Sequence, residues 1–290
     1  MNLSRRSFLA SSGAALGLGP AVALSAASKK LAGLRIGVTD WNLRQTGKVE
    51  AVALAKTLGF EGLEVSLGRK PVDNKLPLDN PQLQAQYLAA ANERQIKLVG
   101  TCLDILHVNY LKNDKLAQKW VADGIPITRK LNARTMLLPF FGKGGLQTRQ
   151  EMDYVGDVLR ELAPEARKAG VVLLLENMLS AEDNVRIIER AGSPAVLVYY
   201  DTGNSANAGF DPVKEIRWLG KSRIGQIHLK DKGYLGEGGI NFPEVMRAIA
   251  DIGYAGFAIL ETSAPSGSVE SDMRRNLKYL GELIEQIRRS

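Results

Sequence analysis

Four apolar segments in the second half of the chain end on residues that can bind a metal or move a proton. V-V-L-L-L-E, A-V-L-V-Y-Y-D and I-G-Q-I-H-L carry Glu176, Asp201 and His228, and G-F-A-I-L-E-T carries Glu261. Burying several neighbouring carboxylates would be prohibitive without a cation. Oxygen-rich ligation with one imidazole suits Mn²⁺ or Co²⁺, with Mg²⁺ and Zn²⁺ as alternatives. If these segment ends meet, we expect one divalent metal ion bound by all four residues.

Each of these residues also has a simpler interpretation. Asp201 precedes T-G-N, which is typical of a helix N-cap. His228, one of only two histidines in the chain, is at the end of an apolar segment where a histidine is more often a satisfied core residue. It is the succession of four such residues on consecutive segments that favours ligation over these alternatives.

Glu176 and Glu261 are in addition the candidate acid/base pair. A proton next to a carbonyl is too weakly acidic for a free carboxylate, but a metal can stabilise the developing enediolate. Two glutamates from different strands can approach the reacting carbon from opposite faces, so that one removes the proton and the other returns one. If only one glutamate can act on the substrate, the same proton removal leads to isomerisation. If the next carbon carries a leaving group, it leads to elimination.

The segments that must position these residues alternate between strand and helix patterns. We expect strands at 34–39, 62–66, 97–103, 135–140, 171–176, 195–201, 224–229 and 256–262, and helices at 49–58, 81–94, 115–131, 150–169, 183–191, 212–219, 242–252 and 271–288. Such alternation favours parallel strands joined by right-handed crossovers. Eight units in about 255 residues predict a single α/β domain with the (β/α)₈ TIM-barrel fold, whose strand ends form the active site. A doubly wound sheet is the alternative, but no G-x-G-x-x-G follows the first strand.

The first 27 residues are expected to be an export signal that precedes a barrel domain at 31–290. S-R-R-S-F-L-A at 4–10 is a twin-arginine pattern, and a small, apolar run without acidic residues follows it. A disordered basic tail is the alternative. Since no cysteine ends the run, we expect no stable membrane anchor, a transient contact with the twin-arginine (Tat) export machinery, and a periplasmic or secreted protein.

The charge and the cysteine content limit the kinds of partner and cross-link that we expect for this protein. The formal net charge of +7 falls to +5 without the two arginines of the signal, and the charges are mixed along the chain. We therefore expect no nucleic-acid partner. Cys102 is the only cysteine, so no disulfide can form within the chain. The sequence leaves the oligomeric state open, a homo-oligomer included.

Several motifs resemble the xylose isomerase-like TIM-barrel superfamily, the sugar phosphate isomerase/epimerase group, from about residue 34 to the end. They are L-L-L-E-N, Y-Y-D-T-G-N, I-H-L-K-D, G-E-G-G-I-N-F-P-E-V and G-Y-A-G-F-A-I-L-E. The similarity to ketose 3-epimerases implies one Mn²⁺- or Co²⁺-like ion on the four residues named above, with Glu176 and Glu261 as acid and base. Such epimerases often have a substrate-binding His where this chain has Asn204, and an Arg where the loop after His228 offers Lys230 and Lys232.

Further substrate contacts are expected around the mouth of the barrel. Trp41 follows the first strand and can stack on a sugar face, although a packing role is equally consistent. Glu64 is near the end of the second strand and is expected to point inward, and Asp104 and His107 follow the third strand and are expected at the mouth. The candidate substrate-binding residues are Trp41, Glu64, His107, Asn204 and Lys230, with an auxiliary base or a structural loop residue as the alternatives for His107. F-F-G-K-G-G at 140–145 is a candidate mobile lid.

The leading hypothesis is a divalent-metal-dependent sugar isomerase or epimerase acting on a small-molecule carbohydrate. A metal-dependent 3-keto-glycoside lyase or hydrolase on the same barrel is an alternative, which export favours because extracytoplasmic glycosides are more plausible substrates than sugar phosphates. A non-catalytic sugar-binding barrel is another. Endonucleases of this fold hold several metals with many histidines, which a chain with two histidines does not supply.

Overall fold

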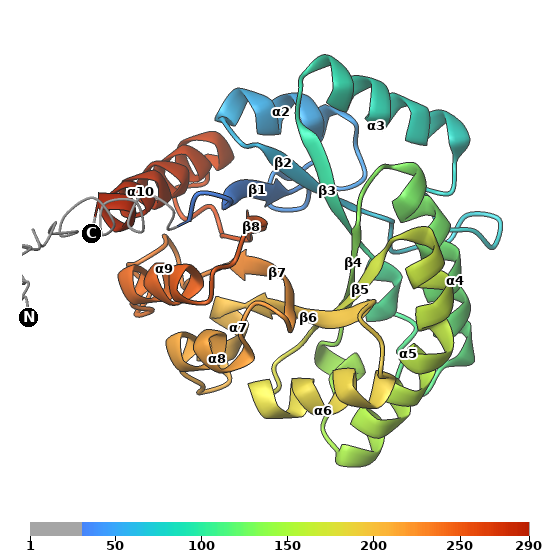
Figure 1. Cartoon of the computed structure of the whole chain (residues 1–290). Helices are drawn as coiled ribbons and strands as arrows, with labels where there is room; N and C mark the ends of the chain where they lie inside the picture. Colours follow the sequence, from blue (N-terminus) through green and yellow to red (C-terminus); the bar gives the residue numbers. More distant parts are fainter. Residues whose placement is uncertain (1–30, 290) are drawn as a thin grey trace, which may run out of the picture.

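Eight parallel strands, each paired with the next in chain order and the last with the first, form a closed barrel in the computed structural model, which describes residues 31–289 (Figure 1). The strands are β1 (Arg35–Thr39), β2 (Gly62–Ser66), β3 (Lys97–Cys102), β4 (Thr135–Pro139), β5 (Val172–Glu176), β6 (Val196–Asp201), β7 (Ile224–Leu229) and β8 (Phe257–Leu260). The predicted (β/α)₈ barrel is therefore confirmed. The expected export signal at 1–27 lies outside the described residues.

A ring of helices surrounds the barrel (Figure 1). The expected helices are α2 (Glu50–Leu58), α3 (Pro81–Glu93), α4 (Lys115–Lys130), α5 (Arg149–Ala169), α6 (Ala181–Ala191), α8 (Pro212–Leu219), α9 (Phe242–Asp251) and α10 (Val269–Arg289). Their boundaries follow capping chemistry: Thr148 and Glu151 form a capping box at the start of α5, and Gly170 ends it in the left-handed conformation. None of the helices in the described part of the chain is long and apolar enough to cross a membrane.

Three short helices were not among those predicted from hydrophobic periodicity, although the N-cap pattern at Asp201 marks the start of one of them. They are η1 (Asp104–His107), η2 (Gly142–Gly144) and α7 (Thr202–Asn207), and each follows the carboxyl end of a strand. A helix of three to six residues completes too few turns to display an apolar period, so periodicity cannot reveal it. Because all three lie in loops on the strand ends, they shape the mouth of the barrel.

Two separate apolar clusters stabilise the fold. The large cluster lies between the barrel and its helices, and it includes the buried side chains of Trp120, Tyr87 and Phe242. A small cluster consists of Cys102, Leu137, Leu174 and Tyr199, which come from β3, β4, β5 and β6. Alternate residues of a strand point to opposite faces, so the barrel strands are largely apolar on both faces, with the buried polar side chains of Glu64 and Gln226 as exceptions inside β2 and β7.

Gly225 and Leu174 interlock in the barrel wall. A Cβ built on Gly225 would overlap Leu174 Cδ2, and Leu174 has no exposed surface. We expect Gly225→Ala to lower the free energy of unfolding by about 1–3 kcal/mol, as overpacked cores do. Urea denaturation measures this, and Gly281→Ala in α10 is the control, because a Cβ there meets no atom within 4 Å. An unchanged midpoint for Gly225→Ala would contradict the packing assignment.

Candidate active site

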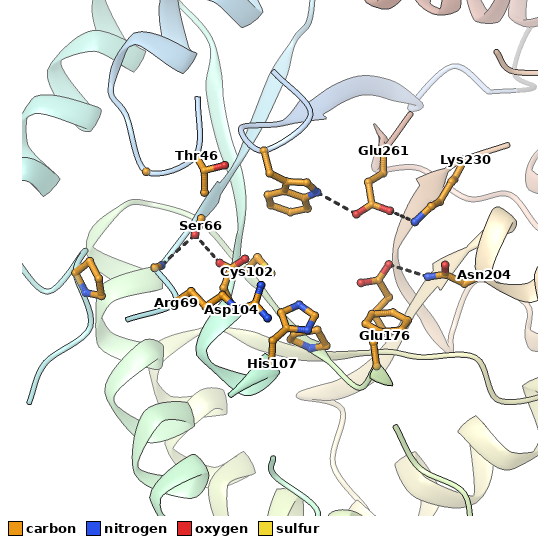
Figure 2. A pocket seen from close by; sticks show the side chains of 16 residues that line it. Thr46, Ser66, Arg69, Cys102, Asp104, His107, Glu176, Asn204, Lys230 and Glu261 are labelled. Carbon is orange, nitrogen blue, oxygen red and sulfur yellow. Dashed lines mark hydrogen bonds and ion pairs between the residues drawn. The ribbon is translucent and has the colours of Figure 1, made fainter. Parts of the chain in front are cut away.

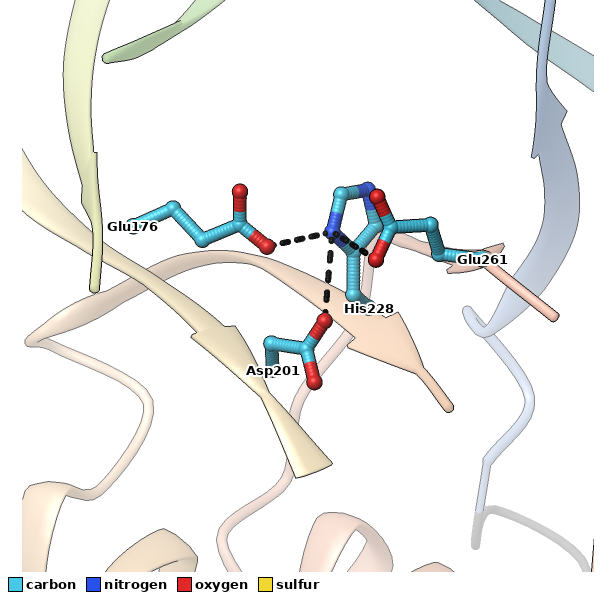
Figure 3. Close-up of side chains that lie close together, drawn as sticks. All are labelled: Glu176, Asp201, His228 and Glu261. Atoms are coloured by element: carbon cyan, nitrogen blue, oxygen red, sulfur yellow. Dashed lines mark hydrogen bonds and ion pairs between the residues drawn. The ribbon is translucent and has the colours of Figure 1, made fainter. Parts of the chain in front are cut away.

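The four predicted metal ligands lie together at the carboxyl end of the barrel (Figure 3). Glu176 and Asp201 end β5 and β6, His228 lies in β7, and Glu261 directly follows β8. One ligand atom from each lies within 4.8 Å of the others. His228 Nδ1 is 2.9 Å from Glu176 Oε1, 3.7 Å from Asp201 Oδ2 and 3.9 Å from Glu261 Oε2.

Burial and charge shift the pKa values of this cluster strongly. Burial raises the pKa of Glu176, and burial together with the charge of Glu261 raises that of Asp201 well above its usual value. Burial also acts to raise the pKa of Glu261, but His228 and Lys230 outweigh it and lower that pKa to about 2. Burial alone would lower the pKa of His228, whereas the carboxylates of Glu261 and Glu176 raise it well above its usual value.

The cluster has the chemistry of a divalent-cation site. With all groups charged, the three carboxylates face two cations among residues 31–289, those of His228 and Lys230. Asp201 Oδ2 is buried and accepts no hydrogen bond from any residue in the described range 31–289. A cation bound there would satisfy this oxygen and displace the proton from Nδ1 of His228, since a ligating imidazole must be neutral.

Asp201 combines the two roles that its sequence context suggested separately. Its Oδ1 accepts a hydrogen bond of 2.7 Å from the backbone N–H of Asn204 and so caps α7. Its Oδ2 faces the cluster, 3.7 Å from Lys230 Nζ. The N-cap therefore orients the carboxylate and leaves one oxygen free to ligate.

Lys230 and Trp41 fix Glu261 from two sides. Lys230 Nζ lies 2.5 Å from Glu261 Oε2, and Trp41 Nε1 donates to Oε1 at 3.0 Å (Figure 2). The stem of Lys230 can reach the cluster because Gly203 has no side chain: a Cβ there would lie 2.7 Å from Lys230 Cγ. On the other side of the cluster, Asn204 Nδ2 donates to Glu176 Oε1 at 3.3 Å.

Glu64 lies behind His228, and its side chain has no exposed surface. Its Oε2 is 3.3 Å from His228 Nε2 and accepts a 2.7 Å hydrogen bond from the Tyr199 hydroxyl. The sequence grouped Glu64 with the substrate contacts, whereas the structure places its carboxylate against the far nitrogen of the imidazole. A carboxylate on Nε2 directs the Nδ1 lone pair toward the other three ligands and makes the imidazole a better ligand.

We expect Glu64→Gln to weaken Mn²⁺ binding by about 10- to 100-fold, because partners of a ligating histidine typically contribute this much to affinity. Titration calorimetry of Mn²⁺ into the metal-free protein measures the change. Glu215→Gln is the matched control: Glu215 is likewise buried and accepts a tyrosine hydrogen bond, from Tyr200, but contacts none of the four ligands. Equal affinity in both variants would show that Glu64 does not orient His228.

A cavity of 720 Å³ opens above the cluster (Figure 2). Of the candidate substrate-binding residues, Trp41, His107, Asn204 and Lys230 line it together with Glu176 and Glu261, whereas Glu64 does not. Asp104 also lines it. In the predicted lid, Phe141 lines the cavity and stacks on His107 with ring centres 6.2 Å apart. Mobility of this segment stays a prediction.

Sequence reasoning missed three polar residues of this cavity: Thr46, Ser66 and Arg69. Ser66 ends β2, so the rule that selected the polar ends of the later strands would have found it as well. Thr46 and Arg69 lie in loops, where no periodicity marks the direction of a side chain.

Comparisons with known proteins agree with this architecture. A family model described as xylose isomerase-like TIM barrel matches residues 52–283. A 2-epi-5-epi-valiolone 7-phosphate 2-epimerase of Actinoplanes sp. is 26% identical over 68% of this chain and 72% of its own length. An L-ribulose 3-epimerase of Mesorhizobium japonicum is 30% identical over 45% of this chain and 48% of its own length.

A solved structure of an L-ribulose 3-epimerase has the same fold. It superimposes with a TM-score of 0.72 at 21% identity and covers 88% of this chain and 96% of its own.

Proposed function

Because the chain belongs to the xylose isomerase-like TIM-barrel family, we propose that it is a divalent-metal-dependent sugar isomerase or epimerase that removes a proton next to a sugar carbonyl. The observation that carries this proposal is the placement of Glu176 and Glu261 beside His228 Nδ1, at 2.9 Å and 3.9 Å, with both side chains lining the cavity (Figure 3). The epimerases among the relatives support the reaction class.

The two glutamates act in turn on the carbon next to the carbonyl. One carboxylate accepts the proton from the carbon next to the carbonyl, and the other delivers a proton to the opposite face, which inverts the centre. Lys230 and Trp41 hold Glu261 in place, and Asn204 holds Glu176. Both glutamates line the cavity, so a bound sugar reaches them directly.

Glu176, Asp201, His228 and Glu261 are the residues that would hold the metal, and we propose Mn²⁺ or Co²⁺. When bound, the ion supplies positive charge that stabilises the enediolate oxygens. The donor set of three carboxylates and one imidazole fits such an ion.

The experiment that tests the function is proton exchange in D₂O followed by NMR. The mature protein, with Mn²⁺ and again after chelation, is incubated with free ketoses and with 3-keto-glycosides. Metal-dependent incorporation of deuterium at one carbon supports proton abstraction, and a new diastereomer then identifies an epimerase. A released aglycone identifies the lyase variant instead. Absence of exchange on every substrate would contradict the proposal and favour a sugar-binding barrel.

We further propose that the protein is exported by the twin-arginine route. Its support is the S-R-R-S-F-L-A pattern at 4–10. Export after folding would let the site load a weakly binding metal in the cytoplasm, before Zn²⁺ or Cu²⁺ can compete outside. Fractionation of cells that express the full chain, compared with an Arg5→Lys/Arg6→Lys variant, tests the route. Isolation of the exported enzyme with Zn²⁺ as its active metal would contradict the loading argument.

A further inference from the structure

We propose that the wall of the cavity facing the glutamates is a second sugar subsite, formed by Ser66, Arg69, Asp104 and His107, and that the substrate is a keto-glycoside with a second neutral sugar unit. The inference rests on the proposed function and adds the substrate class to it. Figure 2 shows these four residues on one side of the cavity, and Glu261, Lys230, Asn204 and Glu176 on the other.

The cavity has room for more than one sugar ring. Its volume is 720 Å³, and a single ring held against the glutamates leaves the wall around Arg69 and Asp104 to solvent. This volume lies in the upper half of the range that is usual for pockets that bind drug-sized molecules.

Asp104 is a preorganised acceptor in this wall. The Ser66 hydroxyl donates to Asp104 Oδ2 at 2.5 Å and itself accepts from the backbone N–H of Gly68 at 3.0 Å. These bonds fix the rotamer of Ser66 and the position of the carboxylate, which lines the cavity. Asp104 is half-buried, and burial raises the pKa of its carboxyl group. A sugar hydroxyl is the kind of donor that such a carboxylate accepts from.

Arg69 and His107 complete the donor set. Arg69 has no carboxylate partner in the described part of the chain, whereas Lys230, the other cationic residue of the cavity wall, is paired with Glu261. Burial and the charge of Arg69 lower the pKa of His107, so its imidazole is neutral and can both donate and accept. Its ring stacks on Phe141, which adds an apolar surface for the C–H face of a sugar.

The charge of the wall selects a neutral polyol over a phosphate. Asp104 and Arg69 have opposite charges, so together they offer both an acceptor and a donor without a net positive charge. Phosphate sites collect several donors and exclude carboxylates, because a carboxylate repels the dianion and accepts no bond from it. The carboxylate of Asp104 therefore disfavours a sugar phosphate in this subsite.

The test compares three probes that share one reacting ring: 3-keto-D-glucose, its 6-phosphate, and 3-keto-cellobiose. We expect kcat/KM for metal-dependent deuterium exchange to be at least about tenfold higher for the disaccharide than for the monosaccharide, and no gain from the phosphate. Asp104→Asn and Arg69→Met should each lower the disaccharide-to-monosaccharide ratio about tenfold, toward one, since both remove a charge-assisted hydrogen bond. Lys70→Met is the matched control, because Lys70 is exposed on the same loop and does not line the described cavity.

An equal kcat/KM for monosaccharide and disaccharide, an unchanged ratio in both subsite variants, or a preference for the phosphate would overturn the subsite while leaving the epimerase reaction intact. Binding of unoxidised cellobiose, followed by saturation-transfer NMR, provides a readout without turnover. Saturation transfer to both rings, reduced for one ring in Asp104→Asn, supports the subsite even if no probe exchanges deuterium. Exchange failing on all probes would count against the proposed function, and cellobiose failing to bind would count against the subsite.

Discussion

Replacing Glu176 or Glu261 with glutamine is expected to lower kcat/KM for sugar epimerisation by at least about 10²- to 10⁴-fold, which is the usual contribution of a positioned acid or base. Both carboxylates line the cavity, and they lie 2.9 Å and 3.9 Å from His228 Nδ1. Glutamine keeps the shape and one oxygen but cannot accept or return the proton. The rate of diastereomer formation measures the effect, at Mn²⁺ concentrations that saturate each variant.

The pattern of the residual reaction discriminates between two acid/base residues and one. If each glutamate serves one face of the carbon, each variant should still exchange deuterium into one epimer while it no longer forms the other. Glu215→Gln is the control, since it changes a buried carboxylate that lies outside the cavity wall. Inversion at the wild-type rate in either variant would remove that glutamate from the acid/base pair.

Removing the metal is expected to abolish turnover and to lower the thermal stability of the protein. Without a cation, His228 and Lys230 are the only cationic residues in the described part of the chain that balance the carboxylates of Glu176, Asp201 and Glu261. A cation at about 100 times its dissociation constant stabilises the folded state by about 2.7 kcal/mol. The lost charge stabilisation of the enediolate is worth several kcal/mol, so we expect turnover to fall by at least about 10³-fold.

Chelation followed by calorimetry and the D₂O assay measures both effects, and added Mn²⁺ should reverse them. The control is His228→Ala, in which Mn²⁺ should no longer raise the unfolding temperature because the only nitrogen ligand is missing. Full activity after exhaustive chelation would show instead that Lys230 and His228 provide the positive charge that the reaction needs.

The candidate ligands were predictable because each follows from a local pattern. Glu176, Asp201, His228 and Glu261 close apolar strands, and in a parallel barrel all strand ends of one kind meet on one face. The same rule, applied to the loops after the strands, predicted four further residues that line the cavity: Trp41, His107, Asn204 and Lys230. The order of the strands needed no structure, since the closed barrel keeps the order of the chain.

The inward direction of Glu64 follows from strand alternation, since Glu64 and Ser66 lie two residues apart in β2, but the partner that its carboxylate meets could not be predicted. β2 pairs with β3 through Leu63 and Leu98 and then through Glu64 and Gly100, so that Val99 is skipped. Gly100 leaves room beside the carboxylate: a Cβ there would lie 3.2 Å from Glu64 Oε1. A period-two pattern gives the face to which Glu64 points, but it does not reveal the shifted register or the contact between the carboxylate and His228 Nε2.

The sequence by itself determined the eight strand–helix units, the closed parallel barrel and the acidic cluster with its histidine at the strand ends. The tertiary structure decided which partners surround them. It places Glu64 behind His228, and it pairs Ser66 with Asp104 in the cavity wall that faces the glutamates. The physical reason is separation along the chain. Hydrophobic periodicity is a property of neighbouring residues, whereas contacts between residues 38 or 164 positions apart exist only after the barrel has closed.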